Sequence, residues 1–282
     1  MKHSACLPLC LGILLTTLFP SCVRDDEEEP PAELVVEGWI EEGGYPVVQL
    51  GETRSVDQGM QDINDYVVRW GKVTISDGEN SVILTGGYDE DYFPPYKYTS
   101  YNMVGKAGKT YTLTAEYRGR KVTAVTTIPH RVQLDSLHVV RSESDTLFYV
   151  KAFFRDPPEE KNRYGLFSKR AGKDKAFLLS PLGVFSDEVV SSSVSADVYC
   201  GTSVYTETDR HASRYFKKGD LVQVKLCHMD EASYRFWRSY SNLLQLSSNM
   251  FFPYTQDFES NIRGGKGYWC GYGTHTLSVR IR

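Results

Sequence analysis

The sequence predicts a mainly β fold, with an N-terminal immunoglobulin-like β-sandwich over residues 34–128. A second β-rich domain over residues 129–282 carries one amphipathic helix. Three observations lead to this prediction. Aromatic residues make up 13% of the chain, with 19 tyrosines, and aromatic and β-branched side chains suit the pleated, half-buried surface of a sheet. Short segments of alternating hydrophobicity, separated by turn residues, follow one another from Glu33 onward. A single stretch near residue 240 has helical spacing instead.

The first 21 residues have the pattern of an export signal. Met1-Lys2-His3 is a short basic start, and a leucine-rich apolar run extends from there to Phe19. This run is shorter than the roughly 20 apolar residues that span a bilayer as a helix. We therefore expect a signal peptide that is removed on export.

Cys22 is the expected site of lipid attachment. The preceding residues, Leu18-Phe19-Pro20-Ser21, resemble a lipobox, although Phe19 and Pro20 are unusual at their positions. The alternative is an incidental cysteine beside an ordinary cleavage site. One acyl chain binds a bilayer only marginally whereas several hold firmly, so a multiply acylated Cys22 would anchor the mature protein to a membrane.

Residues 22–33 are expected to form an acidic tether that ends near Pro30-Pro31. A like-charged, proline-ended segment should stay extended and solvated. The acids resemble the signal by which lipoproteins of Bacteroidota reach the outer face of the outer membrane. The alternative is a spacer with no sorting role. The residues of this expected surface-export signal are Asp25, Asp26, Glu27, Glu28 and Glu29.

The formal charge of −4 lies in this tether. Of the 36 acidic and 32 basic residues, six acids and Arg24 fall within residues 22–33 and Lys2 falls in the leader, which leaves 30 of each sign in residues 34–282. Sequence-independent binding of nucleic acid requires a basic surface. The neutral body therefore argues against a nucleic-acid partner.

In the first domain, strand and turn segments alternate from residue 34. Residues 34–40 and 45–50 flank Gly43-Gly44. Hairpins are predicted around Asp77-Gly78 and around Arg118-Gly119-Arg120, because glycine supplies the positive φ of tight turns. The flanking strands are predicted at 72–76 with 81–85, and at 110–114 with 122–126.

In the second domain, strands are predicted over 132–140, 147–154, 162–169 and 221–227, whereas 186–208 fits a strand or a loop. The helix should start at Asp230 as N-cap and end near residue 246, with Phe236, Trp237 and Tyr240 on its apolar face. The glycine-rich segment 264–273 lacks the G-K-[ST] ending of a phosphate loop. It predicts a tight loop or bulge before the last strand.

The most suggestive candidate site is the segment 88–98, a predicted loop of the first domain that concentrates aromatic and acidic residues. Aromatic faces can stack on sugars or contact peptides, so this loop is a candidate contact for a ligand or a partner protein. The alternative is a loop that folds back on its own sandwich. Its aromatic residues are Tyr88, Tyr92, Phe93, Tyr96 and Tyr98.

Three cysteines remain after the expected processing: Cys200, Cys227 and Cys270. Because an exported compartment permits disulfides, one bridge between two of them and one free thiol are expected. The alternative, a metal site that adds His228 and His275, lacks any C-x-x-C spacing. No nucleophile motif such as G-x-S-x-G occurs, so neither an enzymatic activity nor a cofactor or metal is expected.

Several short sequence segments resemble one family in their residues, order and spacing. The segments are residues 34–40, 72–77, 105–113, 135–137, 230–237 and 260–267. From residue 34 to the end, the chain resembles an uncharacterised lipoprotein family of Bacteroidota, the domain of unknown function 4249. Genes of that family commonly lie beside TonB-dependent outer-membrane receptors.

The resemblance implies an outer-membrane, surface-facing lipoprotein, a TonB-dependent receptor as partner and a small ligand of unknown identity. It implies no catalytic residues. Two alternatives stay open: a stand-alone carbohydrate- or peptide-binding surface module, and a structural or adhesive surface component.

Overall fold

The computed structural model describes residues 32–53, 66–158, 161–189, 192–201, 214–246 and 258–282. Within these ranges the mainly β class is confirmed, with many strands and one α-helix. The expected signal peptide over residues 1–21, the lipidation site and the acidic export signal lie outside the described residues. These last positions are Cys22, Asp25, Asp26, Glu27, Glu28 and Glu29.

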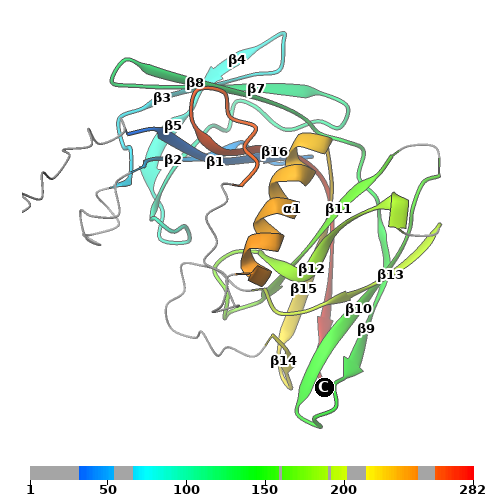
Figure 1. The fold of residues 1–282 in the computed structure, drawn as a ribbon. Coiled ribbons are helices and arrows are strands. Elements are labelled where there is room, and N and C mark those ends of the chain that lie inside the picture. Colours follow the sequence, from blue (N-terminus) through cyan, green and yellow to red (C-terminus); the bar gives the residue numbers. More distant parts are fainter. Residues whose placement is uncertain (1–31, 54–65, 159–160, 190–191, 202–213, 247–257) are drawn as a thin grey trace, which may run out of the picture. The chain divides into compact units, whose positions relative to one another are not determined.

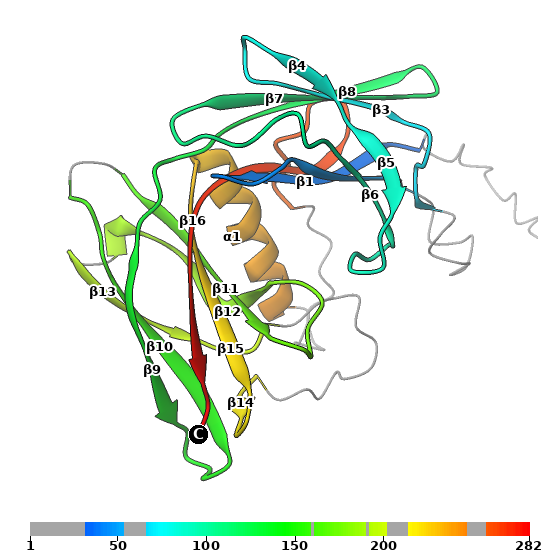
Figure 2. The same cartoon turned by 180° about the vertical axis from the view of Figure 1, so that it is seen from behind.

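Eight strands form the largest sheet (Figures 1 and 2). In sheet order they are β12 (Leu178–Ser186), β11 (Arg163–Arg170), β15 (Leu221–Met229), β16 (Lys266–Arg280), β1 (Leu34–Glu41), β2 (Val47–Glu52), β6 (Tyr96–Thr99) and β5 (Thr85–Tyr88).

Strand β16 joins the two halves of the chain. It pairs in parallel with β1 from Lys266 to Tyr272 and antiparallel with β15 from Tyr272 to Arg280. Tyr272 is therefore in register with Glu41 on one side and with Met229 on the other. Figures 1 and 2 show β16 running continuously from beside β1 to beside β15. The hydrogen-bonded sheet therefore takes strands from both sides of the expected boundary at residue 128.

A four-stranded sheet covers the β1, β2, β6 and β5 part of the large sheet. In sheet order it contains β4 (Ser81–Ile83), β3 (Lys72–Ser76), β7 (Thr110–Tyr117) and β8 (Arg120–Thr127). Both predicted hairpins are confirmed, and Arg118 and Gly119 take positive φ angles of 48° and 78° in the turn between β7 and β8.

The core between these two sheets contains the fully buried Val36, Ile75, Leu113 and Trp269, of which Trp269 comes from β16. The Trp269 indole N–H donates to the Tyr111 carbonyl at 3.0 Å. The layers form a sandwich, but an immunoglobulin-like strand order is not confirmed. The physical reason is that β1 pairs with a strand from the far end of the chain.

A third sheet packs against β11, β15 and the second part of β16. It contains β13 (Ser193–Val198), β10 (Leu147–Arg155), β14 (Phe216–Lys217) and β9 (Leu134–Arg141), and β10 is its centre. The core here includes Phe148, Phe154, Leu166 and Val224. Segment 186–208 thus contains a strand at 193–198 and a 3₁₀ turn at Asp187–Val189, and its residues 190–191 and 202–208 lie outside the described ranges.

The predicted helix is confirmed as α1 (Glu231–Leu246), and Asp230 caps it by accepting the Ser233 N–H at 2.8 Å. Its aromatic face packs on β11, β12, β15 and β16, where Phe236 is buried and the Trp237 indole N–H donates to the Tyr272 hydroxyl. The prediction of a loop over 264–273 is wrong from Lys266 onward. Those residues begin β16, where Gly267 lets the chain approach β1 closely.

Candidate binding surface

The segment 88–98 is a hairpin at the edge of the large sheet. Strands β5 and β6 pair so that Tyr88 lies opposite Tyr96 and Gly86 lies opposite Tyr98. Residues directly opposite each other in an antiparallel pair point to the same face. The prediction of a single loop is therefore wrong at both ends, where Tyr88 and Tyr96 belong to strands.

Tyr98 is part of the core rather than of a surface. Its side chain is buried, its hydroxyl donates to the Val68 carbonyl at 2.7 Å, and the Gly71 N–H donates to the same hydroxyl at 3.0 Å. Burial raises the pKa of Tyr98 to about 12. Tyr98 therefore has a structural role and is removed from the predicted contact residues.

Tyr92 folds back on the body of the protein, as in the alternative for this segment. Its ring stacks on Trp39 with 6.2 Å between centroids, and the Lys97 ammonium lies 4.3 Å from its centroid. Lys97 also pairs with Asp89 at 2.8 Å. This hydrogen bond, together with one from the Asp91 N–H, lowers the pKa of Asp89.

Two further contacts hold the hairpin. The Gln49 amide donates to the carbonyls of Pro94 and Tyr96 at 2.7 and 3.1 Å. The Lys175 ammonium donates to the Glu90 carbonyl at 2.7 Å, which ties the tip to the turn between β11 and β12. The tip is therefore fixed at several points along its backbone.

Tyr88 and Phe93 do face solvent, with 76% and 46% of their surfaces exposed. The most exposed large apolar side chain nearby is Trp70, at 89%. Sequence reasoning does not single out Trp70, because one aromatic residue outside a periodic segment does not reveal its exposure. Its position in Arg69-Trp70-Gly71, between two strand segments, was the available signal.

The contacts of Tyr96 bring Trp70 and Tyr88 to the same region. The Tyr96 ring crosses Gly86, where a Cβ atom would lie only 2.4 Å from the Tyr96 hydroxyl oxygen, and that hydroxyl donates to the Arg69 carbonyl at 3.0 Å. Residues 69–70 and strand β5 therefore meet at the Tyr96 ring. We call Trp70, Tyr88 and Tyr96 the aromatic corner.

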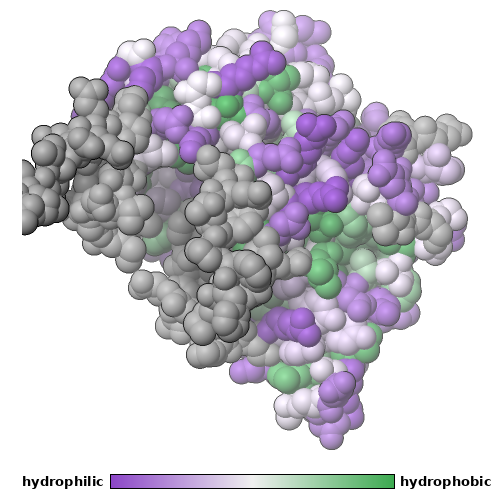
Figure 3. Space-filling model, in the orientation of Figure 1, coloured by the Kyte–Doolittle hydropathy of each residue, from purple (hydrophilic) through white to green (hydrophobic). Residues whose placement is uncertain are grey.

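A polar groove of about 480 Å³ runs along α1. Glu231 accepts from Arg163 at 3.3 Å and from Arg235 at 2.8 Å, and the Arg238 guanidinium lies 5.9 Å from the Tyr234 ring. Figure 3 shows hydrophilic residues along the helix and hydrophobic ones beside it, over β12 and β13. The groove is lined by Arg163, Ser186, Glu188, Glu231, Tyr234, Arg235, Arg238, Ser239, Asn242 and Glu259.

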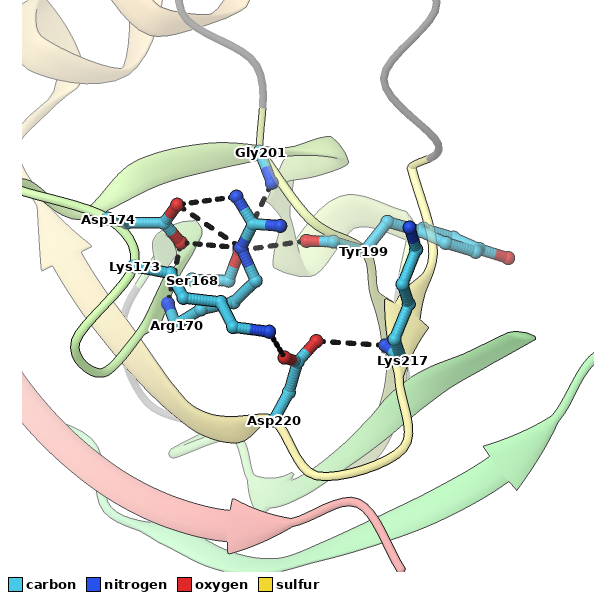
Figure 4. Close-up of polar contacts among 8 residues, drawn as sticks. All are labelled: Ser168, Arg170, Lys173, Asp174, Tyr199, Gly201, Lys217 and Asp220. Carbon is cyan, nitrogen blue, oxygen red and sulfur yellow. Dashed lines mark hydrogen bonds and ion pairs between the residues drawn. The ribbon is translucent and has the colours of Figure 1, made fainter. Parts of the chain in front are cut away.

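A charged cluster lies near the end of β11 (Figure 4). Arg170 forms a bidentate pair with Asp174, with a shortest distance of 2.6 Å. Asp220, whose side chain is 1% exposed, accepts from the Lys173 ammonium at 2.6 Å and from the Lys217 N–H at 2.8 Å. Each of these charges has a partner, so the cluster has a structural role in tying the turns before β12 and β15 together.

The disulfide prediction is corrected, because Cys200, Cys227 and Cys270 are all free and buried. Cys227 of β15 is in register with Thr274, while Cys270 is in register with Trp39 of β1, so these two thiols are not cross-strand neighbours. Burial raises the pKa of all three thiols, to about 12 for Cys270.

The histidines considered as metal ligands are engaged with backbone. The Nδ1 atom of His228 is 2.7 Å from the His130 carbonyl, and the Nδ1 atom of His275 accepts the Leu134 N–H at 3.0 Å. Among the described residues, no group of three or more His, Cys, Asp or Glu side chains is placed to hold a metal ion.

The fold and this surface define a class: a multi-sheet β protein with one packed helix and exposed aromatic rings at a sheet edge. The chain belongs to the family of the domain of unknown function DUF4249, whose model matches residues 22–278. No curated protein matches the chain. None of the helices in the described ranges has the length and apolar character needed to cross a membrane.

Proposed function

We propose that the mature protein is a lipid-anchored, surface-exposed subunit of the outer membrane. It acts as a non-enzymatic accessory or ligand-binding partner of a TonB-dependent nutrient receptor. The observation that carries the proposal is the aromatic corner, where Trp70 and Tyr88 expose 89% and 76% of their surfaces. Exposed aromatic rings on a fixed backbone are typical of binding surfaces.

The membrane attachment is supported by the N-terminal residues. A leader with a basic start and an apolar run ends at a lipobox-like stretch before Cys22. Five consecutive acids follow after two intervening residues, beginning at Asp25. The body beyond residue 33 is electrically neutral, so attraction to anionic lipid does not explain a membrane location. The lipid on Cys22 would supply it.

The absence of enzymatic activity is supported by the chemistry of the groove on α1. The Ser239 hydroxyl already donates to the Phe236 carbonyl and accepts the Glu259 N–H. An activated nucleophile must instead donate its proton to a neighbouring base. Ser239 therefore has a structural role, and the groove that it lines favours binding over catalysis.

Co-purification tests the proposal. The tagged full-length protein is extracted from outer membranes in a mild detergent after brief cross-linking, and its partners are identified by mass spectrometry. We expect a TonB-dependent receptor in near-equal amount. Cys22→Ser, which cannot be acylated, should lose most of this recovery. Wild-type protein that is recovered without any such receptor would overturn the proposal.

The acidic tether has its own test. Replacing the five acids from Asp25 to Glu29 with alanine should leave the protein on the inner leaflet of the outer membrane. Protease added to intact cells should then no longer digest it. Unchanged digestion would assign the tether the role of a spacer.

The second candidate is a surface module that binds carbohydrate or peptide without a receptor, and the exposed rings of the aromatic corner support it as well. Recovery of no receptor together with ligand binding at the corner would select this candidate. Neither a receptor nor a soluble ligand is expected for a structural or adhesive component.

A further inference from the structure

We infer that the aromatic corner is a carbohydrate-binding site in which Trp70 and Tyr88 contact the faces of neutral sugar rings. The inference rests on the proposed role of the corner in ligand binding. It does not depend on the transporter partner.

Folding does not explain the exposure of these rings. Trp70 is 89% exposed, whereas Trp269 is fully buried in the core. A tryptophan on the surface leaves a large apolar area in water, and exposed apolar side chains that lie in one region mark interaction sites. Tyr88 of β5 adds a second exposed ring, opposite Tyr96 of β6.

The backbone beneath the rings is held in place by hydrogen bonds. On one side of Trp70 the Arg69 carbonyl accepts from Tyr96, and on the other side the Gly71 N–H donates to Tyr98. Tyr88 is held by its strand pairing with Tyr96. Little conformational freedom is left to lose on binding, which favours affinity from a small contact area.

The surface beside the Tyr88 ring is formed by a glycine and by the Tyr96 ring. The edge strand β5 reads Thr-Gly-Gly-Tyr, and alternate residues of a strand share a face, so Gly86 lies on the same face as Tyr88. Gly86 carries no side chain, and the Tyr96 ring lies across it. No side chain projects from this face at Gly86, which suits a flat sugar ring better than a peptide side chain that needs a pocket.

Carboxylates lie near the exposed rings. Glu90 and Asp91 are exposed on the hairpin tip, while the charge of Asp89 is already paired with Lys97. Sugars combine apolar C–H faces with hydroxyl donors, and carboxylates are strong acceptors for such donors. A protein partner would instead favour an interface core depleted of charge. The combination of exposed rings and free carboxylates therefore favours a carbohydrate.

The test is affinity electrophoresis of the detergent-extracted full-length protein in native gels that contain a neutral soluble glucan, xylan or mannan. We expect at least one polysaccharide to retard the wild-type protein. Trp70→Ala and Tyr88→Ala should each weaken retardation about tenfold, equivalent to about 1.4 kcal/mol. Trp70→Phe, which keeps a ring, should retain part of the binding.

The matched control is Tyr101→Ala. Tyr101 is also 76% exposed, but it pairs with Tyr45 rather than with the corner, so its removal should leave retardation unchanged. Thermal unfolding should be the same for all variants, because the removed side chains are exposed.

Failure of all three polysaccharides to retard the protein would overturn the inference, as would equal losses in Tyr101→Ala. Capture of peptides from a random library, insensitive to Trp70→Ala, would assign the edge strand to peptide binding instead. Receptor co-purification without sugar binding would leave the proposed function standing and remove this inference alone.

Discussion

The Thr126 hydroxyl donates a hydrogen bond to the Asp230 carboxylate at 2.7 Å across 104 residues of sequence. The same carboxylate accepts the Thr127 N–H at 2.9 Å, and its other oxygen caps α1 through Ser233. Thr126 in turn accepts the Gly271 N–H at 2.8 Å. One buried junction therefore joins β8, the start of α1 and β16.

Removing this junction should destabilise the whole fold. Asp230→Ala loses the helix cap and two charge-assisted hydrogen bonds, and we expect the free energy of unfolding to fall by about 2–4 kcal/mol. Asp230→Ser, which can still cap the helix, should lose about half as much. Urea denaturation followed by circular dichroism measures both. Equal losses in the two variants would show that the helix cap contributes little, whereas no loss in Asp230→Ser would show that the contact with β8 contributes little.

The close approach of β16 to β1 gives a second stability prediction. Gly267 has φ of 109°, and a Cβ atom there would lie 1.8 Å from the Val36 carbonyl oxygen. Gly267→Ala should therefore destabilise the protein by about 3 kcal/mol, since strand pairing must shift. The control is Gly43→Ala, where φ is 76° but the space is open, and only about 1 kcal/mol of backbone strain is expected. Similar denaturation midpoints for the two variants would contradict the pairing of these strands.

Local pattern was enough to predict most strands and the helix. The period-two segments at β3, β7, β8 and β10 and the cap at Asp230 appear in the sequence because each depends on residues close together in the chain. The parallel pairing of β1 with β16 depends on residues more than 200 positions apart. No local pattern encodes such a pairing, so the glycines of 264–273 predict a loop when the sequence is taken alone.

Only part of the candidate site can be predicted from the sequence, and the reason is again the distance along the chain. The aromatic content of 88–98 pointed to the hairpin, but alternation could not say that Tyr98 enters the core while Tyr88 stays exposed. That division depends on the segment 68–71, whose backbone bonds Tyr96 and Tyr98 from about 27 positions away. Trp70 belongs to the site through this contact alone.

The buried Asp220 gives a pH prediction. Burial raises the pKa of this carboxyl, but hydrogen bonds from Lys173 and the Lys217 N–H outweigh burial, and the folded-state pKa falls below the ordinary 3.8. Because the folded pKa is lowered, the stabilisation is complete above the unfolded pKa and is lost as pH falls through the folded pKa. Asp220→Asn should therefore lower the urea midpoint at pH 7, with a loss of about 1–3 kcal/mol.

The difference between Asp220→Asn and wild type should shrink as the pH is lowered below 3.8, where the wild-type carboxyl also becomes protonated. Urea titrations at pH 7 and pH 3 check this. A difference that is the same at both pH values would show that the charge of Asp220 is not what stabilises these turns.

The free thiols give a chemical prediction. Cys200, Cys227 and Cys270 are buried with raised pKa values, so a thiol reagent should not react with the native mature protein on the timescale of minutes. Under denaturing conditions without reductant it should titrate all three. A count of one that rises to three only after reduction would restore the disulfide.

The most direct test of the account as a whole is maleimide labelling of Tyr88→Cys on intact cells. Tyr88 is 76% exposed, so a cysteine at this position should react readily. Acylation would block Cys22, and burial shields the other three thiols. A membrane-impermeant maleimide should label Tyr88→Cys, and not wild type, before the outer membrane is permeabilised. Labelling that appears only after permeabilisation would contradict a surface-exposed aromatic corner.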